Sequence, residues 1–303
     1  ADLAASMGRM ILRLREHTEQ PSWQSLDGPR IETNALTRKA SVLYEKLRYT
    51  LDYQDENLVR RNALERMLRR IITYESPDSY GHTLLVELVR ANYLPDAQIP
   101  EAVATEIDQI IAWYRALHDN ITSQRDLAWS LLATELDRYL FPNTERDVVL
   151  GAVRERIGTY VTPKDSGTVS GQRFTYALTI ACRETLAHDT HHEIRLALFR
   201  STVPGWGTKL DAHIAAQSYD ALIGTFEELL RDPLVATIKG HLHNERIYYT
   251  LLLDIVRAYQ GDANLLLAHQ PGLESHIREK LSEAYRAHEK RVRESGSRAL
   301  IYI

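Results

Sequence analysis

The sequence predicts an all-α protein, a multi-helix bundle of about ten helices. Glycine and proline are scarce, with 14 and 10 positions among 303 residues, while Leu, Ala, Arg and Glu, which favour helices, are abundant. No segment longer than four residues alternates apolar and polar side chains, as a half-buried strand would. Apolar residues make up 44% of the chain, which is enough for a sizeable core.

Residues 36–72 carry the clearest helical pattern. They read LTRKASVLYEKLRYTL, a polar break DYQDEN, and LVRRNALERMLRRII. In each half the leucines fall on one arc of a helical wheel and most charged side chains on the other, which predicts two amphipathic helices joined by a hinge. Glu65 and Arg69 are spaced for an i,i+4 ion pair. We expect this block to be a packing or docking device.

Arg60 breaks the pattern, because the wheel places it inside the apolar arc of the second helix. It lies either in the first turn at the rim of the helix or buried against a carboxylate, because a buried guanidinium without a partner would cost several kcal/mol. Asp52 and Glu45 are the nearest candidates in the sequence.

Prolines and glycines separate the remaining helical segments. Residues 161–171, VTPKDSGTVSG, combine Pro, Gly and Ser and predict a linker. This divides the chain into an N-terminal helical unit at 1–160 and a C-terminal unit at 172–303, and it allows two helical subdomains. Helices are expected at 3–18, 79–94, 101–118, 121–140, 144–160, 172–187, 190–200, 209–230, 233–259 and 273–298.

Charge and cysteine content exclude several classes of protein. The net charge of −4 gives no overall field for binding nucleic acid. The single cysteine, Cys182, rules out an intramolecular disulfide and fits a reducing, cytoplasmic compartment. It lies in the apolar run FTYALTIAC, which favours a buried, inert thiol over a nucleophile. No apolar run is long enough to cross a bilayer, and no cofactor motif is present.

A histidine cluster at 188–193 raises the possibility of a metal site. Glu184, His188 and either His191 or His192 would share one side of a helix, with spacing that suits Zn²⁺. The same side carries Arg195, and apolar residues lie opposite, which is the pattern of a solvated face. Since the paired motifs of metal-binding helices are missing, we predict no metal and keep Glu184, His188 and His192 as weak candidates.

Arg183 and His188 match the loose RxxxxH pattern of HEPN-type ribonucleases. An arginine and a histidine at this spacing occur often by chance in a chain of this composition. A helical hydrolase, acting through these residues or through the histidine cluster, is therefore the alternative function. The segment at 205–209, GWGTK, lacks the spacing of a phosphate-binding P-loop and predicts a turn with Trp206 packed beneath it.

Basic residues gather on one side of the 36–72 block. Residues 38–70 hold nine Lys or Arg against five acidic residues. The expected interaction surface consists of Arg61, Arg66, Arg69 and Arg70, and it would contact a partner protein, a second copy of the chain or lipid headgroups. Nucleic acid is disfavoured, because aromatic rings for stacking are sparse on that face.

Basic residues at 286–298 come just before an apolar end at 299–303. This order is typical of the cytoplasmic flank of a membrane helix. It predicts that the chain is an excerpt and that membrane contact occurs through a segment beyond Ile303.

The stretch LYEKLR, then LDY, then ENLVRRNALER, within residues 43–66, is similar to a block in an uncharacterised all-helical, membrane-associated protein family of candidate-phylum (Patescibacteria-type) bacteria. The likeness covers about forty residues and assigns no activity. Together these observations predict a non-enzymatic helical interaction or scaffold domain, cytoplasmic and at the inner face of the membrane.

Overall fold

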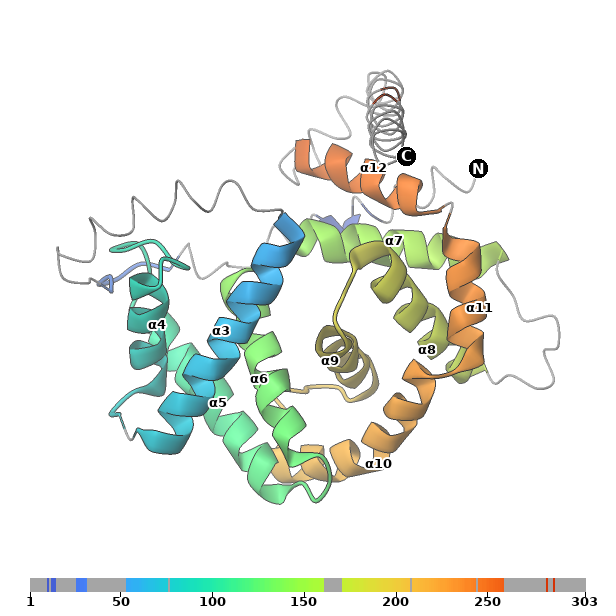
Figure 1. Ribbon diagram of the computed structural model, residues 1–303. Coiled ribbons are helices and arrows are strands. Elements are labelled where there is room, and N and C mark those ends of the chain that lie inside the picture. Colours follow the sequence, from blue (N-terminus) through green and yellow to red (C-terminus); the bar gives the residue numbers. More distant parts are fainter. Residues whose placement is uncertain are drawn as a thin grey trace, which may run out of the picture. The chain divides into compact units, whose positions relative to one another are not determined.

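The computed structural model is helical throughout most of the part of the chain that it describes (Figure 1). Eleven helical elements have described bounds, ten α-helices and one π-helix, and the described residues contain no strand beyond an isolated bridge between Arg30 and Pro100. The all-α prediction is confirmed. The structure describes residues 10, 12–14, 26–31, 53–75, 77–160, 171–207, 209–243, 245–258, 282 and 286, with the backbone alone at 53–57 and 258.

The helices group into two compact units. The first unit contains α7 (Thr144–Tyr160), α8 (Gly171–Cys182), the π-helix η2 (Arg183–Ala187), α11 (Pro233–Leu242) and α12 (Glu245–Ala258), with the short described stretch near residue 13. The second contains α3 (Tyr53–Tyr74), α4 (Tyr80–Arg90), α5 (Ala102–Asn120), α6 (Arg125–Leu140), α9 (His191–Thr202) and α10 (Ala212–Leu230).

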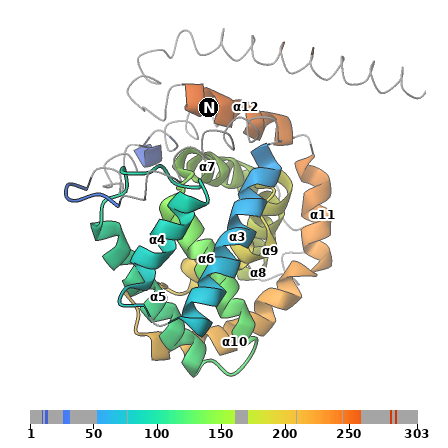
Figure 2. The same ribbon diagram turned by 60° about the vertical axis from the view of Figure 1, so that its left-hand side comes forward.

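Helix α6 is the centre of the second unit. It packs against α3, α5 and α9 and is buried along most of its length (Figure 2). A helix enclosed on several sides is expected to be apolar around much of its circumference. Yet α6 also buries two carboxylates, Glu135 and Asp137, which are 3% and 5% exposed. Both need partners inside the unit.

A stack of aromatic rings joins α9 and α10 in the second unit. The ring of Phe199 lies 4.4 Å from that of Trp206 and 5.3 Å from that of Tyr219, centroid to centroid. Aromatic pairs at such distances stabilise a core beyond the area they bury. Trp206 is 4% exposed, so the prediction that it packs beneath its turn is confirmed.

Gly81 permits the close approach of α4 to α5. A Cβ atom built at this position would lie 2.1 Å from the carbonyl oxygen of Ala104. Asp108 on α5 fixes the start of α4 by accepting hydrogen bonds from the Ser79 hydroxyl (2.6 Å) and the Gly81 amide (2.8 Å). Backbone lies against backbone here, so any side chain larger than hydrogen must force the helices apart.

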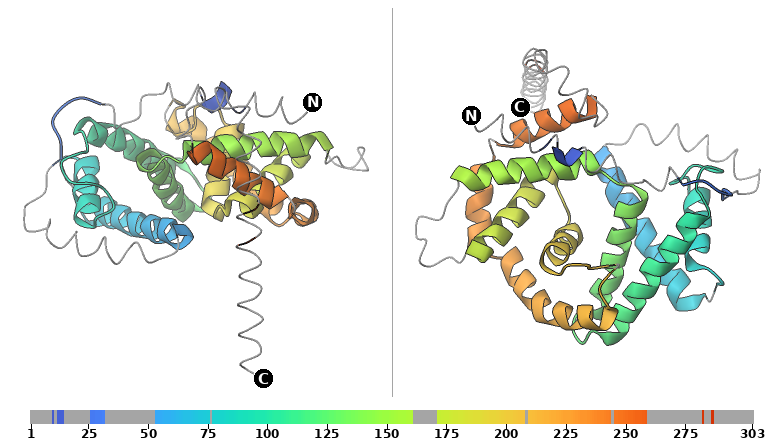
Figure 3. Two further views of the ribbon diagram at one scale, coloured as in Figure 1. Left: turned by 90° about the horizontal axis from the view of Figure 1, so that it is seen from above. Right: turned by 180° about the vertical axis from the view of Figure 1, so that it is seen from behind.

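In the first unit α8 packs against α11, and α7 packs against α12 (Figure 3). Two predicted helices differ in detail. The segment at 172–187 ends as an α-helix at Cys182 and continues as the π-helix, and the segment at 233–259 is two helices, α11 and α12. The second break falls in the polar run at 243–245, and Glu245 then begins α12, where a carboxylate complements the helix dipole.

The division between units differs from the predicted boundary at 161–171. Helices α7 and α8, which precede and follow that segment, both belong to the first unit. Helices α9 and α10 belong to the second unit, because α9 packs against α6 and α10 packs against α5, both much earlier in the chain. A pairing so remote in sequence leaves no mark on local composition.

Several predictions fall on residues that the structure does not describe. These are the first helix of the 36–72 block, the candidate carboxylates Glu45 and Asp52, the linker at 161–170, and the basic and apolar end at 286–303 apart from the position of Arg286. In the described part of the chain, no helix is both long enough and apolar enough to cross a membrane. The expected membrane segment therefore stays a prediction.

Candidate anion-binding site

The first unit contains a cavity of about 240 Å³ on which three arginines meet. The arginines belong to three separate segments: Arg13 to the short N-terminal stretch, Arg154 to α7 and Arg183 to the π-helix. The complete lining is Arg13, Asp147, Val148, Leu150, Gly151, Arg154, Thr179, Cys182 and Arg183. Like charges brought together in a concave place indicate a site for the opposite charge.

Helix α7 supplies one face of the site. Asp147, Gly151 and Arg154 are four and then three residues apart, so the helical repeat brings them to the same side. A glycine within a helix costs up to about 1 kcal/mol relative to alanine, so a glycine at this position calls for a local reason.

Arg13 provides that reason. A Cβ atom built at Gly151 would lie 3.0 Å from Nη1 of Arg13, closer than side chains ordinarily pack. The missing side chain therefore lets the guanidinium of Arg13 lie against the backbone of α7. Arg13 also forms an ion pair with Glu155, which is not part of the lining.

The end of α8 and the π-helix form the opposite side. Arg154 donates a hydrogen bond to the Thr179 hydroxyl (3.3 Å), which donates in turn to the Thr175 carbonyl (2.8 Å). Nη2 of Arg183 lies 3.6 Å from a carboxylate oxygen of Asp147. The wider π-turn begins at Arg183, directly after Cys182. Single π-turns are rare and are frequent at functional sites.

Cys182 lines the cavity as a protonated thiol. It is fully buried, and this burial raises the pKa of its thiol to about 12, while the nearby Arg154 lowers it only in part. A thiol that holds its proton at neutral pH is a poor nucleophile. The prediction that Cys182 is buried is confirmed. In this cavity its protonated side chain forms part of the apolar lining.

The charge of the lining is positive. The lining contains three guanidinium groups and one carboxylate, that of Asp147, and a second carboxylate, that of Glu155, pairs with Arg13 from outside the lining. Arginine stays protonated in proteins, and its planar fork matches carboxylate and phosphoryl oxygens. The arrangement can hold an anion, and it contains no histidine that could move a proton.

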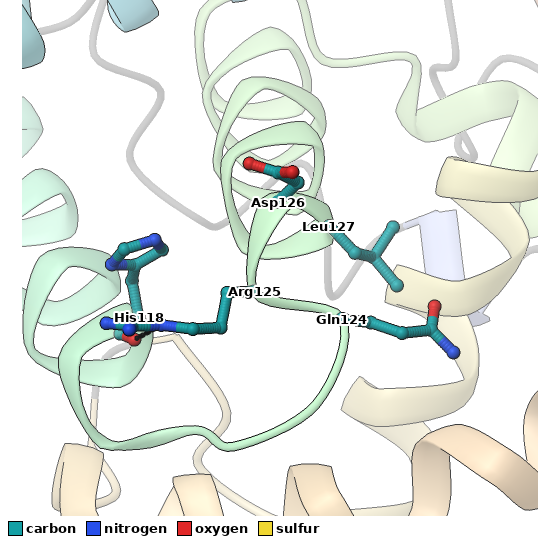
Figure 4. Close-up of a pocket in the computed structure, with 5 residues that line it drawn as sticks. All are labelled: His118, Gln124, Arg125, Asp126 and Leu127. Carbon is teal, nitrogen blue, oxygen red and sulfur yellow. Dashed lines mark hydrogen bonds between the residues drawn. The ribbon is translucent and has the colours of Figure 1, made fainter.

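A second hollow lies where α5 leads into α6, and it is built differently. Figure 4 shows its lining residues: His118, Gln124, Arg125, Asp126 and Leu127. Nε of Arg125 donates to the His118 carbonyl at 3.1 Å, and Gln124, Arg125 and Asp126 are all exposed. This broad, open hollow balances one arginine with one carboxylate and therefore offers no preference for either sign of charge.

Arg60 and Arg61, on α3, are held inside the second unit. Arg60 donates to both carboxylate oxygens of Asp137 (2.8 and 3.4 Å), and its guanidinium lies 4.0 Å from the centre of the Phe141 ring. Arg61 pairs with Asp137 at 3.5 Å and with Glu193 at 2.9 Å. The expectation that Arg60 has a carboxylate partner is confirmed, and the partner lies on α6.

The other arginines of the predicted interaction surface differ among themselves. Arg69 pairs with Glu65 at 3.0 Å in the expected i,i+4 geometry, and Arg70 pairs with Glu75 and Glu87. Arg66 is exposed and pairs with none of the described residues. Of the four arginines Arg61, Arg66, Arg69 and Arg70, only Arg66 therefore presents its charge without a partner in the described part of the chain.

The weak metal candidates do not form a ligand set. Glu184 pairs with Lys239 at 3.0 Å, and His188 closes the π-helix in a left-handed conformation, with φ of 55°. His192 belongs to the second unit, where burial, and then the charge of Arg195, lowers its pKa. Among the described residues, no group of three potential ligands is placed to hold a metal ion.

The RxxxxH pattern is not assembled into one site. Arg183 lines the cavity, whereas His188 is exposed and is not part of the lining. Instead Arg183 is joined there by Arg13 and Arg154, which the sequence patterns do not single out. The one local signal for them is Gly151, a helix-interior glycine three residues before an arginine.

Comparison of the chain with protein-family models, curated proteins and solved structures gives no match. The chemistry of the cavity therefore follows from its own residues.

Proposed function

We propose that the protein is a non-enzymatic helical domain that works by binding, and that its cavity receives an anionic group of the partner. The observation that carries this proposal is the convergence of Arg13, Arg154 and Arg183 on one cavity. Arginine is the residue of choice for recognising carboxylate and phosphoryl groups, because its fork donates two parallel hydrogen bonds.

Binding fits the lining better than catalysis does. Cys182 is protonated at neutral pH, and Asp147 is engaged by Arg183. General acid–base catalysis needs a group poised to exchange a proton near the working pH. The lining supports charge recognition, with fixed positive groups and apolar walls.

The size of the cavity favours one group of a partner over a whole ligand. Pockets for drug-sized molecules span roughly 300–1,000 Å³, whereas this cavity has about 240 Å³. A small anion fits, as does the charged head of a larger molecule. This agrees with an interaction domain that recognises one feature of its partner.

The broader proposal places this domain at the cytoplasmic side of a membrane-associated bacterial protein. It is supported by the basic-then-apolar order at 286–303. Flotation with liposomes, using the protein extended to the end of its natural reading frame, tests it. A protein that stays at the bottom of the gradient would remove the membrane part and leave the binding proposal intact.

Calorimetric titration with small anions tests the binding proposal. We expect saturable binding of at least one of inorganic phosphate, malonate and acetate. The Arg154→Gln variant should lose it, because one of the three guanidinium groups is removed. The matched control is Arg66→Gln, which changes the net charge equally at an exposed position. The proposal would be contradicted if none of the three anions bound saturably at concentrations up to about 10 mM, roughly ten times a millimolar dissociation constant.

A further inference from the structure

We propose that the group taken by the cavity is a single carboxylate of a polypeptide partner, and that Arg154 holds both of its oxygens. The carboxylate of a chain terminus and that of an acidic side chain share this chemistry. The inference rests on the proposed function, and it adds the class of ligand and the residue that anchors it. It is supported by the partners of the other two arginines, by the open edge of Arg154, and by the rest of the lining.

Two of the three arginines of the lining already stand beside carboxylates of the chain. Arg13 forms an ion pair with Glu155, and Nη2 of Arg183 lies 3.6 Å from a carboxylate oxygen of Asp147. An external anion gains little from such a group, because it would have to displace or share a partner that the fold holds in place. Recognition of the ligand therefore falls to the remaining guanidinium.

Arg154 is that remaining guanidinium. It is half-buried, and it pairs with no carboxylate in the described part of the chain. A charge held partly away from water is stabilised by a counter-charge. The ligand can therefore neutralise one positive charge at this wall of the cavity, which matches a group that carries one negative charge.

The orientation of Arg154 leaves one edge of its guanidinium open. Nη1 donates to the hydroxyl of Thr179, which is 7% exposed, at 3.3 Å, and this hydroxyl donates to the Thr175 carbonyl at 2.8 Å. Nε and Nη2 of Arg154, on the other edge, form no hydrogen bond with a described residue. Two parallel N–H groups of this kind bind both oxygens of one carboxylate.

The rest of the lining suits the stem of a carboxylic acid better than a third oxygen. The proton of the Thr179 hydroxyl is used by the Thr175 carbonyl, and the thiol of Cys182 is a weak donor. Val148 and Leu150 add buried apolar surface. A phosphoryl group would bring a third oxygen, and an acceptor left unpaired away from water is unfavourable. A carboxylate has only the two oxygens that Arg154 can hold.

The experiment compares acetate, malonate and inorganic phosphate on the whole protein by calorimetry at pH 7.5. We expect acetate to bind saturably, with a dissociation constant of about a millimolar. Malonate should bind no more than about threefold tighter than acetate, because its second carboxylate finds no unpaired guanidinium in the cavity. Phosphate should also bind no more than about threefold tighter than acetate, because its third oxygen lacks a donor.

Two capped amino acids identify the source of the carboxylate. N-acetylalanine presents the carboxylate of a chain terminus, and N-acetylaspartic acid with an amidated terminus presents that of a side chain. The tighter of the two identifies the feature of the partner that enters the cavity. N-acetylalaninamide, which has no carboxylate, is the control and should not bind. Acetate binding without binding of either capped amino acid would overturn the assignment to a polypeptide.

Three variants with the same substitution locate the anchor. Arg154→Lys keeps the charge and loses the two parallel donors, so the affinity for acetate should fall about tenfold. Arg183→Lys makes the same change at an arginine that Asp147 already engages, and its loss should be smaller, about threefold. Arg66→Lys, at an exposed position, should change the affinity less than about twofold. Circular dichroism of each variant verifies the fold.

The outcomes separate this inference from the function on which it depends. Phosphate or malonate binding more than about threefold tighter than acetate would overturn the single carboxylate and keep the proposed anion-binding function. Absence of binding for every anion would remove both. A loss in Arg183→Lys as large as that in Arg154→Lys would overturn the assignment of Arg154 as the anchor.

Discussion

The two units use arginine in opposite ways. In the second unit Arg60 and Arg61 lie between buried carboxylates, with Asp137 contacting both and Glu193 contacting Arg61. In the first unit Arg13, Arg154 and Arg183 share one cavity with Asp147 as its single lining carboxylate. The first arrangement lies among α3, α6 and α9 and is largely buried, whereas the second lines a cavity in which Arg13 pairs with Glu155 and Arg183 with Asp147.

This difference teaches that the number of arginines in a segment says little about binding. The segment richest in arginine, α3, directs most of these residues to carboxylates of its own unit. The cavity arginines come from segments that are unremarkable in charge. Whether an arginine lines a cavity or lies inside a packed core is determined only by the folded chain.

Removing Asp137 should have the largest effect. In Asp137→Ala two buried guanidinium groups lose a shared counter-charge, so we expect a loss of about 3–5 kcal/mol in the free energy of unfolding, measured by urea denaturation. The control is Asp126→Ala, whose carboxylate is 94% exposed and lies 3.7 Å from Arg69, and which should cost less than about 1 kcal/mol. Equal effects would show that the buried cluster is not a stabilising centre.

Alanine substitutions at one glycine in each unit allow the stability of the two units to be compared. Gly81→Ala should lower the free energy of unfolding by about 1–3 kcal/mol or more, because the added Cβ meets the Ala104 carbonyl at 2.1 Å. Gly151→Ala meets the movable end of Arg13, so its stability should be unchanged or up to about 1 kcal/mol higher. Thermal unfolding of the two variants side by side measures the contrast, and a Gly151→Ala variant as unstable as Gly81→Ala would contradict it.

The affinity for a phosphate monoester should rise with pH. The second pKa of such a ligand is about 6, so the dianion fraction grows from about one-tenth at pH 5 to about nine-tenths at pH 7, and the affinity for phenyl phosphate should grow about tenfold. The charged groups at the site are the three arginines, Asp147, Glu155 beside Arg13, and Cys182, whose pKa is raised to about 12.

Sulfate serves as the control for that titration, since it is fully ionised over the same range of pH. Its affinity should stay flat between pH 5 and 7, as measured by the same calorimetric titration. A parallel rise for sulfate and phenyl phosphate would assign the pH dependence to the protein and not to the ionisation of the ligand.

The smallest effect is expected at Asp220, on α10. Partial burial raises the pKa of this carboxyl, but hydrogen bonds from Thr122 and Ser123 outweigh the burial and lower the pKa below its ordinary 3.8. Its contribution to stability is complete above pH 3.8 and is lost as the pH falls through the folded-state pKa. The difference in melting temperature between the protein and Asp220→Asn should therefore shrink below pH 4. A difference that is constant with pH would show that ionisation of Asp220 is irrelevant.

Local patterns predicted much of the second unit's chemistry in outline. The position of Arg60 within an apolar arc left a place at the rim or burial against a carboxylate, because an unpaired buried guanidinium is too costly; the structure shows the second. The i,i+4 pair of Glu65 and Arg69 followed from helical spacing alone, and the structure contains it. The partner of Arg60 was not predictable, since Asp137 is 77 residues away in the chain.

The cavity was beyond the reach of sequence patterns. Arg13 and Arg154 lie far apart in the chain, and no spacing rule relates them. Arg183 was noted only for its distance from His188, and the structure places that histidine outside the cavity lining. Gly151 was the single local hint, and its meaning depended on which side chain lay against it.

The sequence by itself determined the helical class, most helix positions, the buried thiol of Cys182 and the need for a partner at Arg60, because these follow from periodicity, from breakers and from the cost of burying charge. The tertiary structure decided which helices share a unit, which carboxylate meets which arginine, and which arginines line one cavity. Those outcomes depend on contacts between residues far apart in the chain, and no local pattern contains them.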